Sequence, residues 1–187
     1  MQPDRLVMLE NAVFQRVYGK YAGKVTDVDD PLKLGRVKVS VPAIFLNEQK
    51  WAMPCVPYAG PQVGFHFIPP VGAGVWVEFE GGDVSRPIWA GCYWGSSDMP
   101  SDATSPDVKV IATEKTTLVM DDSGSGEVTV KNDQDVTVTL ESDIKSEAGG
   151  ATHTVGSDGV VSESSPGKVE VGASGVTVNN GAFTVSG

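Results

Sequence analysis

Few side chains in this sequence have both the type and the spacing that nucleophilic or metal chemistry requires. The chain holds two cysteines, Cys55 and Cys92, and two histidines, His66 and His153. Neither cysteine belongs to a Cys-x-x-Cys pair or has a convincing histidine partner, and the sequence Gly-x-Ser-x-Gly does not occur. The sequence therefore predicts no catalytic residues, no cofactor-binding residues and no metal ligands.

Two pairs of carboxylates are close enough in sequence to be considered for general acid–base work. Glu78 and Glu80 alternate along a predicted strand, so both are expected on its outward face. Asp29 and Asp30 precede Pro31 and belong to a predicted turn. We expect all four to be solvated charges, and we expect that the protein is not an enzyme.

The two histidines have different surroundings. His66 lies between two phenylalanines and has no second ligand nearby, which is typical of a loop residue or a partner contact. His153 lies between two threonines, far from the last residue. It could bind a metal ion or an anion only if several chains brought their imidazoles together on a symmetry axis. An ordinary packed or exposed histidine is the expected alternative.

The charge balance argues against several classes of partner. Lys and Arg number 14 against 24 Asp and Glu, and the net charge of -10 opposes binding to nucleic acid or anionic lipid. No stretch approaches the roughly 20 apolar residues of a membrane helix, and the first residues lack the apolar core of a signal peptide. We expect a product made soluble in the cytoplasm, with two buried free thiols rather than a disulfide.

Composition changes near Pro106. Beyond it, Phe183 is the sole aromatic residue and Pro166 the sole proline. Residues 1–106 carry a net charge of -2 and residues 107–187 carry -8. The sequence predicts an N-terminal segment over 1–18 that contacts a neighbouring protein, one domain over 19–106 and a second over 107–187.

The first domain is predicted to be a small closed β-barrel of the OB-fold type. Short strands alternate with Gly and Pro, and their valines recur at every second position. The residues expected to face the core are Val37, Val39, Val41, Val75, Val77 and Phe79. Closure into a barrel would remove the exposed edges of such short strands.

The second domain cannot build a core of that kind. It has fifteen valines, and its apolar pairs recur every seven residues near the end: Val169/Val171, Val176/Val178 and Phe183/Val185. Such narrow strands bury too little within one chain, so neighbouring chains must supply the missing walls. Two alternatives are low-complexity disorder, against which the many β-branched residues argue, and a calcium-binding solenoid, whose Gly-Gly-x-Gly-x-Asp repeat is missing.

The first half resembles the OB-fold domain shared by phage baseplate spike proteins, baseplate assembly protein V and the VgrG proteins of type VI secretion. The resemblance rests on the order of its segments rather than on any one of them. They are YAGKV (21–25), DVDDP (27–31), LGRVKVSVP (34–42), WAMP (51–54), YAG (58–60), PPVG (69–72), VWVEF (75–79), GGD (81–83) and PIWAG (87–91).

The resemblance implies an all-β homotrimer: an N-terminal OB-fold barrel followed by a C-terminal intertwined triple-stranded β-helix, or β-prism. Its implied function is that of a central spike, which caps the tail tube at the baseplate hub protein and pierces the target cell envelope when the sheath contracts. Phage tails, tailocins and related particles are all possible sources. The loop 45–51 and the stretch 61–70 are the expected hub contacts. Phe183 and Val185 are expected to contact a separate PAAR-type tip protein.

The alternative function is a carbohydrate-binding adhesin module. OB barrels often bind sugars or single strands, and an exposed Trp51, Trp89 or Trp94 could stack on such a ligand. The acidic charge disfavours nucleic acid but leaves a sugar open.

Overall fold

The computed structural model describes residues 16–185, an all-β chain that divides into two compact units between Asp98 and Met99. This division precedes the boundary expected after Pro106. Most of the expected N-terminal segment, residues 1–15, lies outside the described residues. Within residues 16–185, no helix has the length and apolar character needed to cross a membrane.

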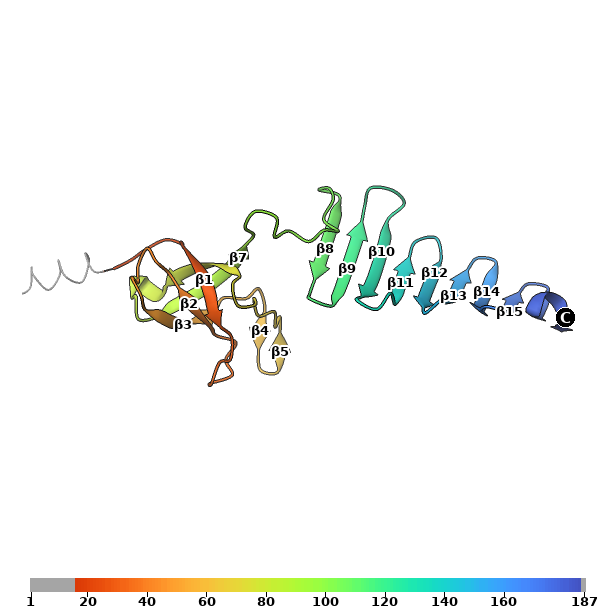
Figure 1. Ribbon diagram of the computed structural model, residues 1–187, viewed down its shortest axis with the longest axis horizontal. Helices are drawn as coiled ribbons and strands as arrows, with labels where there is room; N and C mark the ends of the chain where they lie inside the picture. The colour runs from red at the N-terminus through yellow and green to blue at the C-terminus, as the bar shows by residue number, and fades with distance from the viewer. Residues whose placement is uncertain (1–15, 186–187) are drawn as a thin grey trace, which may run out of the picture. The chain divides into compact units, whose positions relative to one another are not determined.

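The first unit is a closed five-stranded barrel, as the sequence predicts (Figure 1). Its strands are β1 (Tyr21–Asp27), β2 (Val37–Ser40), β3 (Gln49–Pro54), β6 (Gly74–Phe79) and β7 (Pro87–Tyr93). They follow the order β1-β2-β3-β7-β6, and β6 pairs with β1 to close the ring. β3 and β7 are parallel and the other pairs are antiparallel. This is a five-stranded barrel consistent with an OB fold.

The barrel core comes from the alternation seen in the sequence. Val37, Val39 and Val41 are fully buried, and Val75 and Val77 join them from the opposite wall. The other buried apolar residues are Val25, Phe45, Ala52, Phe79 and Trp89. The barrel therefore forms its own core within the chain.

One glycine allows two strands of the barrel to be tied together by an aromatic ring. Gly74 of β6 lies opposite Tyr93 of β7, and a Cβ at Gly74 would lie 2.6 Å from that ring. The Tyr93 ring therefore crosses β6, and its hydroxyl donates to the Gly23 carbonyl of β1 at 3.2 Å. A side chain at position 74 would displace this ring.

Two small elements decorate the barrel. The hairpin of β4 (Ala59–Gly60) and β5 (Val63–Gly64) is inserted between β3 and β6. The 3-10 turn η1 (Glu80–Gly82) follows β6. Glu80 therefore lies in this turn and not on the strand, contrary to the expectation. The Val17 N–H donates to the Gly82 carbonyl at 2.9 Å, which fixes the entering chain against this turn.

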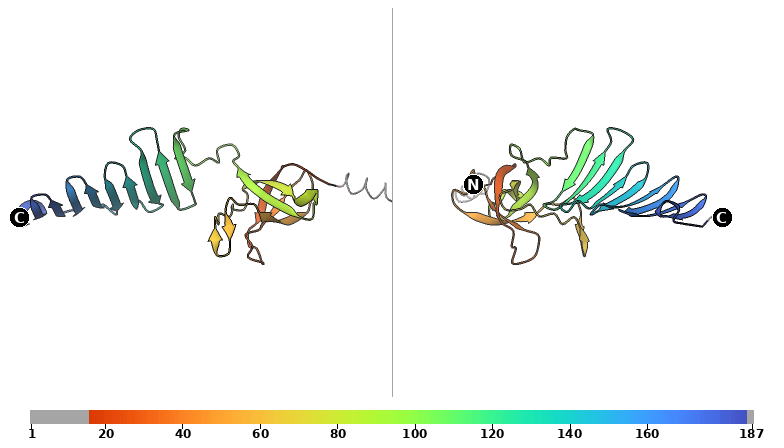
Figure 2. Two further views of the ribbon diagram at one scale, coloured as in Figure 1. Left: turned by 180° about the vertical axis from the view of Figure 1, so that it is seen from behind. Right: turned by 45° about the vertical axis from the view of Figure 1, so that its right-hand side comes forward.

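The second unit is one ten-stranded antiparallel sheet in which each strand pairs with its neighbours in sequence (Figures 1 and 2). Its first five strands are β8 (Val108–Ala112), β9 (Thr116–Asp121), β10 (Glu127–Asn132), β11 (Thr137–Leu140) and β12 (Ile144–Ala148). The rest are β13 (Ala151–Gly156), β14 (Gly159–Ser164), β15 (Gly167–Gly172), β16 (Gly175–Val178) and β17 (Phe183–Val185), with the 3-10 turn η2 (Asn179–Gly181) before β17.

This topology differs from the expected intertwined β-helix. The backbone hydrogen bonds of the sheet join strands of the same chain. Turns of a few residues reverse the chain, so each strand pairs directly with the strand before it in sequence. Gly149 and Gly150 form such a turn between β12 and β13, with φ of +55° and +81°. The repeated strand-and-turn pattern thus yields a flat meander within one chain.

Candidate assembly surfaces

The ten-stranded sheet has one nearly continuous apolar face. Residues directly opposite each other in antiparallel strands point to the same side, so the strand register defines rows across the sheet. The central row is Ile111, Leu118, Val130, Val138, Ser146, His153, Ser162, Val169, Val178 and Phe183. The outer row on the same side begins with Lys109 of β8 and continues with Met120, Val128, Leu140, Ile144, Val155, Val160, Val171, Val176 and Val185.

The opposite face is mainly polar. Its rows are dominated by threonine and by charged residues, with Val108, Val110, Ala112, Val119 and Val161 as apolar exceptions. Ion pairs join neighbours on this side, such as Lys145 with Glu147 at 3.0 Å. The sheet therefore has two faces of opposite chemistry, which the alternation of Val with Thr, Lys and Glu in the sequence sets up.

Nothing in the described chain buries the apolar face. Ile144 is 49% exposed, Leu140 45% and Val171 45%, whereas the valines of the barrel core are fully buried. Isolated apolar residues on a surface are ordinary, but rows of them along ten strands form a patch of the kind that marks an interface. We define these two rows as the apolar face and treat it as the main candidate assembly surface.

Phe183 and Val185, the expected contacts of a tip protein, lie at the last strand of the two rows. Both are exposed, at 61% and 52%. They continue the apolar face to β17 and leave apolar atoms available at that end of the sheet.

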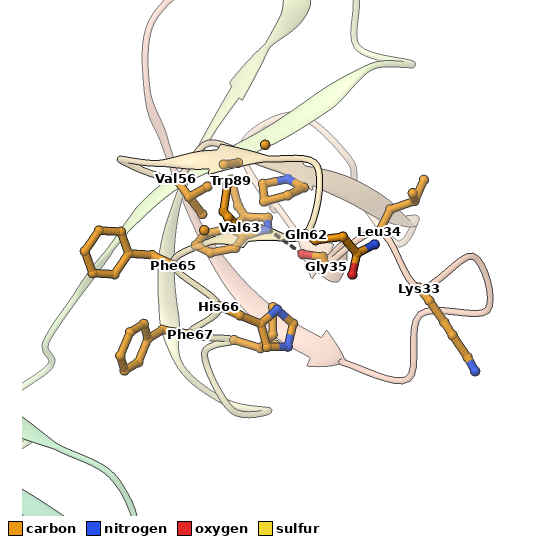
Figure 3. A pocket seen from close by; sticks show the side chains of 15 residues that line it. Lys33, Leu34, Gly35, Val56, Gln62, Val63, Phe65, His66, Phe67 and Trp89 are labelled. Carbon is orange, nitrogen blue, oxygen red and sulfur yellow. Dashed lines mark hydrogen bonds between the residues drawn. The ribbon is translucent and has the colours of Figure 1, made fainter.

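The barrel carries a second apolar surface around the β4–β5 hairpin, which overlaps the stretch 61–70 expected to contact the hub. Tyr58, Val63, Phe65 and Phe67 are each more than half exposed. The rings of Phe65 and Phe67 project to the same side, with centroids 6.4 Å apart, and His66 points away from them (Figure 3). We define these four exposed residues as the hairpin patch.

A groove of about 630 Å³ lies beside the hairpin patch. Val56, Ile68 and Trp89 contribute to its apolar lining, and the Trp89 indole N–H donates to the Gly35 carbonyl at 3.3 Å (Figure 3). His66 is its one imidazole and has no acidic or thiol group beside it in the lining. The groove is suited to contact with an apolar segment, and its lining holds no set of groups for acid–base catalysis.

Asp30 is not the solvated turn residue that the sequence suggested. Its side chain is only 5% exposed and accepts hydrogen bonds from the backbone N–H groups of Leu32, Leu34 and Arg36. The Arg36 guanidinium donates to it at 2.6 Å, and this contact holds the pKa of the Asp30 carboxyl well below its usual range. Asp30 therefore organises the loop between β1 and β2.

Three tryptophans bear on the adhesin alternative. Trp89 is 5% exposed and packs in the core, so the expectation that it could stack on a ligand is wrong. Trp51 lies against two cations, with Arg36 and Lys38 at 5.5 and 5.8 Å from its ring centroid. Trp94 is 64% exposed. The three indoles do not form one shared stacking platform.

Two further expectations need correction. Cys55 and Cys92 are free, as expected, but both are exposed rather than buried. Burial of part of the side chain raises the pKa of the Cys92 thiol, which opposes formation of a reactive thiolate. In the expected hub loop 45–51, Phe45 is in the barrel core, whereas residues 46–49 are exposed, Leu46 at 93%.

A single chain offers no metal centre among residues 16–185, where no group of three or more His, Cys, Asp or Glu side chains gathers. His153 lies in the central row of the apolar face, directly opposite Ser146 and Ser162. Ligands for an ion at this position would have to come from more than one chain.

The first unit is thus a closed five-stranded barrel with its own core and one exposed apolar patch, consistent with an OB fold. Residues 21–94 match the family described as the type VI secretion system/phage-baseplate injector OB domain. The match covers the barrel alone and supports a baseplate-associated structural role for that domain. A search of curated proteins returned no match.

The matched residues end at Trp94, before the ten-stranded sheet begins, so the family match does not cover the apolar face. Sequence reasoning missed the β4–β5 hairpin and its patch. The relevant pattern was the short spacing of Tyr58, Val63, Phe65 and Phe67 among Gly and Pro residues, which is typical of an exposed hairpin loop.

Proposed function

We propose that this chain is the central spike of a contractile injection system and works as a homotrimer without enzymatic activity. The observation that carries the proposal is the apolar face, which residues 16–185 leave uncovered. Three copies of the sheet, each with its apolar face inward, would form a three-sided β-prism. The injector OB domain that precedes the sheet supports this assembly over an unrelated oligomer.

The width of the apolar face favours three copies. Each strand contributes only two or three side chains to that side, as the rows defined above require. Three narrow sheets can enclose such side chains around an axis on all sides, whereas two stacked sheets would leave both rims open to water. Backbone pairing would stay within each chain, and side-chain packing would join the chains.

The prism would be stiff and its outer surface hydrophilic. Ladder hydrogen bonds run through all ten strands, and threonines with paired Lys and Glu would face water. Such a rod resists bending and lateral adhesion, as a needle driven through an envelope by a contracting sheath must. The hairpin patch would contact the baseplate hub, and Phe183 with Val185 would seat a PAAR-type tip protein.

Two matched variants test this arrangement. Val138→Asp puts a carboxylate into the central row, where three copies would be buried together, and Thr139→Asp puts one on the polar face of the same strand. We expect sedimentation velocity to report a dissociated or aggregated Val138→Asp chain and a trimeric Thr139→Asp chain. Equal oligomeric states for the two variants would contradict the proposed use of the apolar face.

A further inference from the structure

The central row of the apolar face has one polar interruption, and it is local. Along the central row, β12, β13 and β14 contribute Ser146, His153 and Ser162, directly opposite one another in register. The positions of this row before and after them are Val138 and Val169. Three adjacent polar residues in the middle of an apolar row need hydrogen-bond partners or a ligand once the face is covered.

The geometry around His153 leaves one ring nitrogen available. Its Nδ1 lies 2.6 Å from the Ser162 hydroxyl oxygen. When Nδ1 carries the proton, the ring donates to Ser162 and Nε2 keeps its lone pair. A hydrogen bond from the second ring nitrogen is the arrangement that orients histidine ligands of metal ions.

The position of His153 within its strand also matters. Ala151 and Val155 flank it on the same side of β13, so the imidazole is in the middle of the three inward positions of that strand. In a three-sided prism the middle position faces the threefold axis. The small Ala151 leaves room beside the ring for the neighbouring copies.

We propose that three His153 side chains converge on the threefold axis and bind one divalent transition-metal ion through their Nε2 atoms. This inference rests on the proposed trimer. Each Ser162 hydroxyl orients its own imidazole, and a water molecule completes the coordination. Glu147 of β12 and Glu163 of β14, the carboxylates on the two strands beside β13, lie on the polar face of the sheet. A site of neutral imidazoles without carboxylates selects Zn²⁺, Ni²⁺ or Cu²⁺ over Ca²⁺ and Mg²⁺.

Such an ion would sit inside the shaft, several strands before Phe183 and Val185, and would cross-link three chains that otherwise meet only through apolar packing. It would also fix the register of the chains, because a one-strand slip would set imidazoles against serines. Buried polar positions that select a single alignment are known devices of oligomer specificity.

Calorimetric titration of the full chain with ZnCl₂, after metal removal with EDTA, tests the inference. We expect one Zn²⁺ per three chains, no such binding by His153→Ala or His153→Gln, and an affinity about 10- to 100-fold weaker in Ser162→Ala. His66→Ala is the matched control and should bind like the unaltered chain. Light scattering on each sample reports whether it is a trimer.

The outcomes separate the two proposals. A trimer that binds no Zn²⁺, binds one ion per chain, or keeps its binding in both His153 variants overturns the axial site and leaves the spike intact. An unaltered chain that is not a trimer overturns the spike, and the axial site with it. If the His153 variants lose the trimer, Ser162→Ala decides: unchanged affinity in a trimeric Ser162→Ala chain contradicts the site.

Discussion

At the scale of single residues, Asp30 shows how a small acidic turn can hold a loop. Its carboxylate accepts hydrogen bonds from three backbone N–H groups and from the Arg36 guanidinium, and the side chain is nearly excluded from water. The Asp-Pro pair predicted a turn, but the donors could not be foreseen because they converge only when the chain has folded back at Leu34 and Arg36. Neighbouring Asp29 is exposed, as expected.

Replacement of Asp30 should therefore destabilise the barrel in a pH-dependent way. Because its folded-state pKa is lowered, the stability that Asp30 contributes is present at neutral pH and is lost as the pH falls from about 5 towards 2. We expect the loss of stability in Asp30→Asn to be largest at pH 7 and to shrink at acid pH. Denaturant unfolding followed by tryptophan fluorescence at several pH values measures it.

Asp29→Asn is the control for this prediction, because it removes a carboxylate from the same turn without removing the Arg36 contact. It should unfold close to the unaltered chain at each pH. If the free energy of unfolding of Asp30→Asn differs from that of the unaltered chain by the same amount at pH 7 and at pH 3, the role given to the ionised Asp30 carboxylate is refuted.

At the scale of elements, the strands of the barrel core followed from period-two alternation. The stretch Val75 to Phe79 alternates and lies within β6, and Val37 with Val39 belongs to β2. The β4–β5 hairpin was missed because two-residue strands carry too little pattern. In the sheet, the valine rows predicted an inward face, but only the register between strands identifies which residues share a row.

The hairpin patch should be dispensable for folding. Phe65→Ser and Phe67→Ser remove exposed rings, so we expect their combined effect on the free energy of unfolding of the barrel to stay within about 0.5 kcal/mol per site. Val39→Ala, which removes two methyl groups from a fully buried position, should cost about 2 kcal/mol. Urea denaturation of the variants compares the two.

A large loss of stability in the Phe65 and Phe67 variants would mean that the hairpin belongs to the barrel core rather than to an assembly surface. In that case the free energy of unfolding of the Phe65 and Phe67 variants should fall by an amount similar to the loss in Val39→Ala.

At the scale of the whole molecule, the two units differ in how they are stabilised. The barrel buries its valines within the chain, while the sheet satisfies its backbone within the chain but leaves one face open. The composition shift near Pro106 predicted this contrast, and the expectation that neighbouring chains cover the sheet followed from it. The sequence could not specify whether strands would pair within or between chains, because both use the same Val-x-Val pattern.

The most direct test of the account is the molar mass of the unaltered full chain in solution by light scattering. Three copies covering one another's apolar faces predict about 59 kDa, three times the 19.6 kDa of one chain, with no change on dilution to low micromolar concentration. A well-behaved 19.6 kDa monomer would contradict the account, because its apolar face would then be stable in water without a partner.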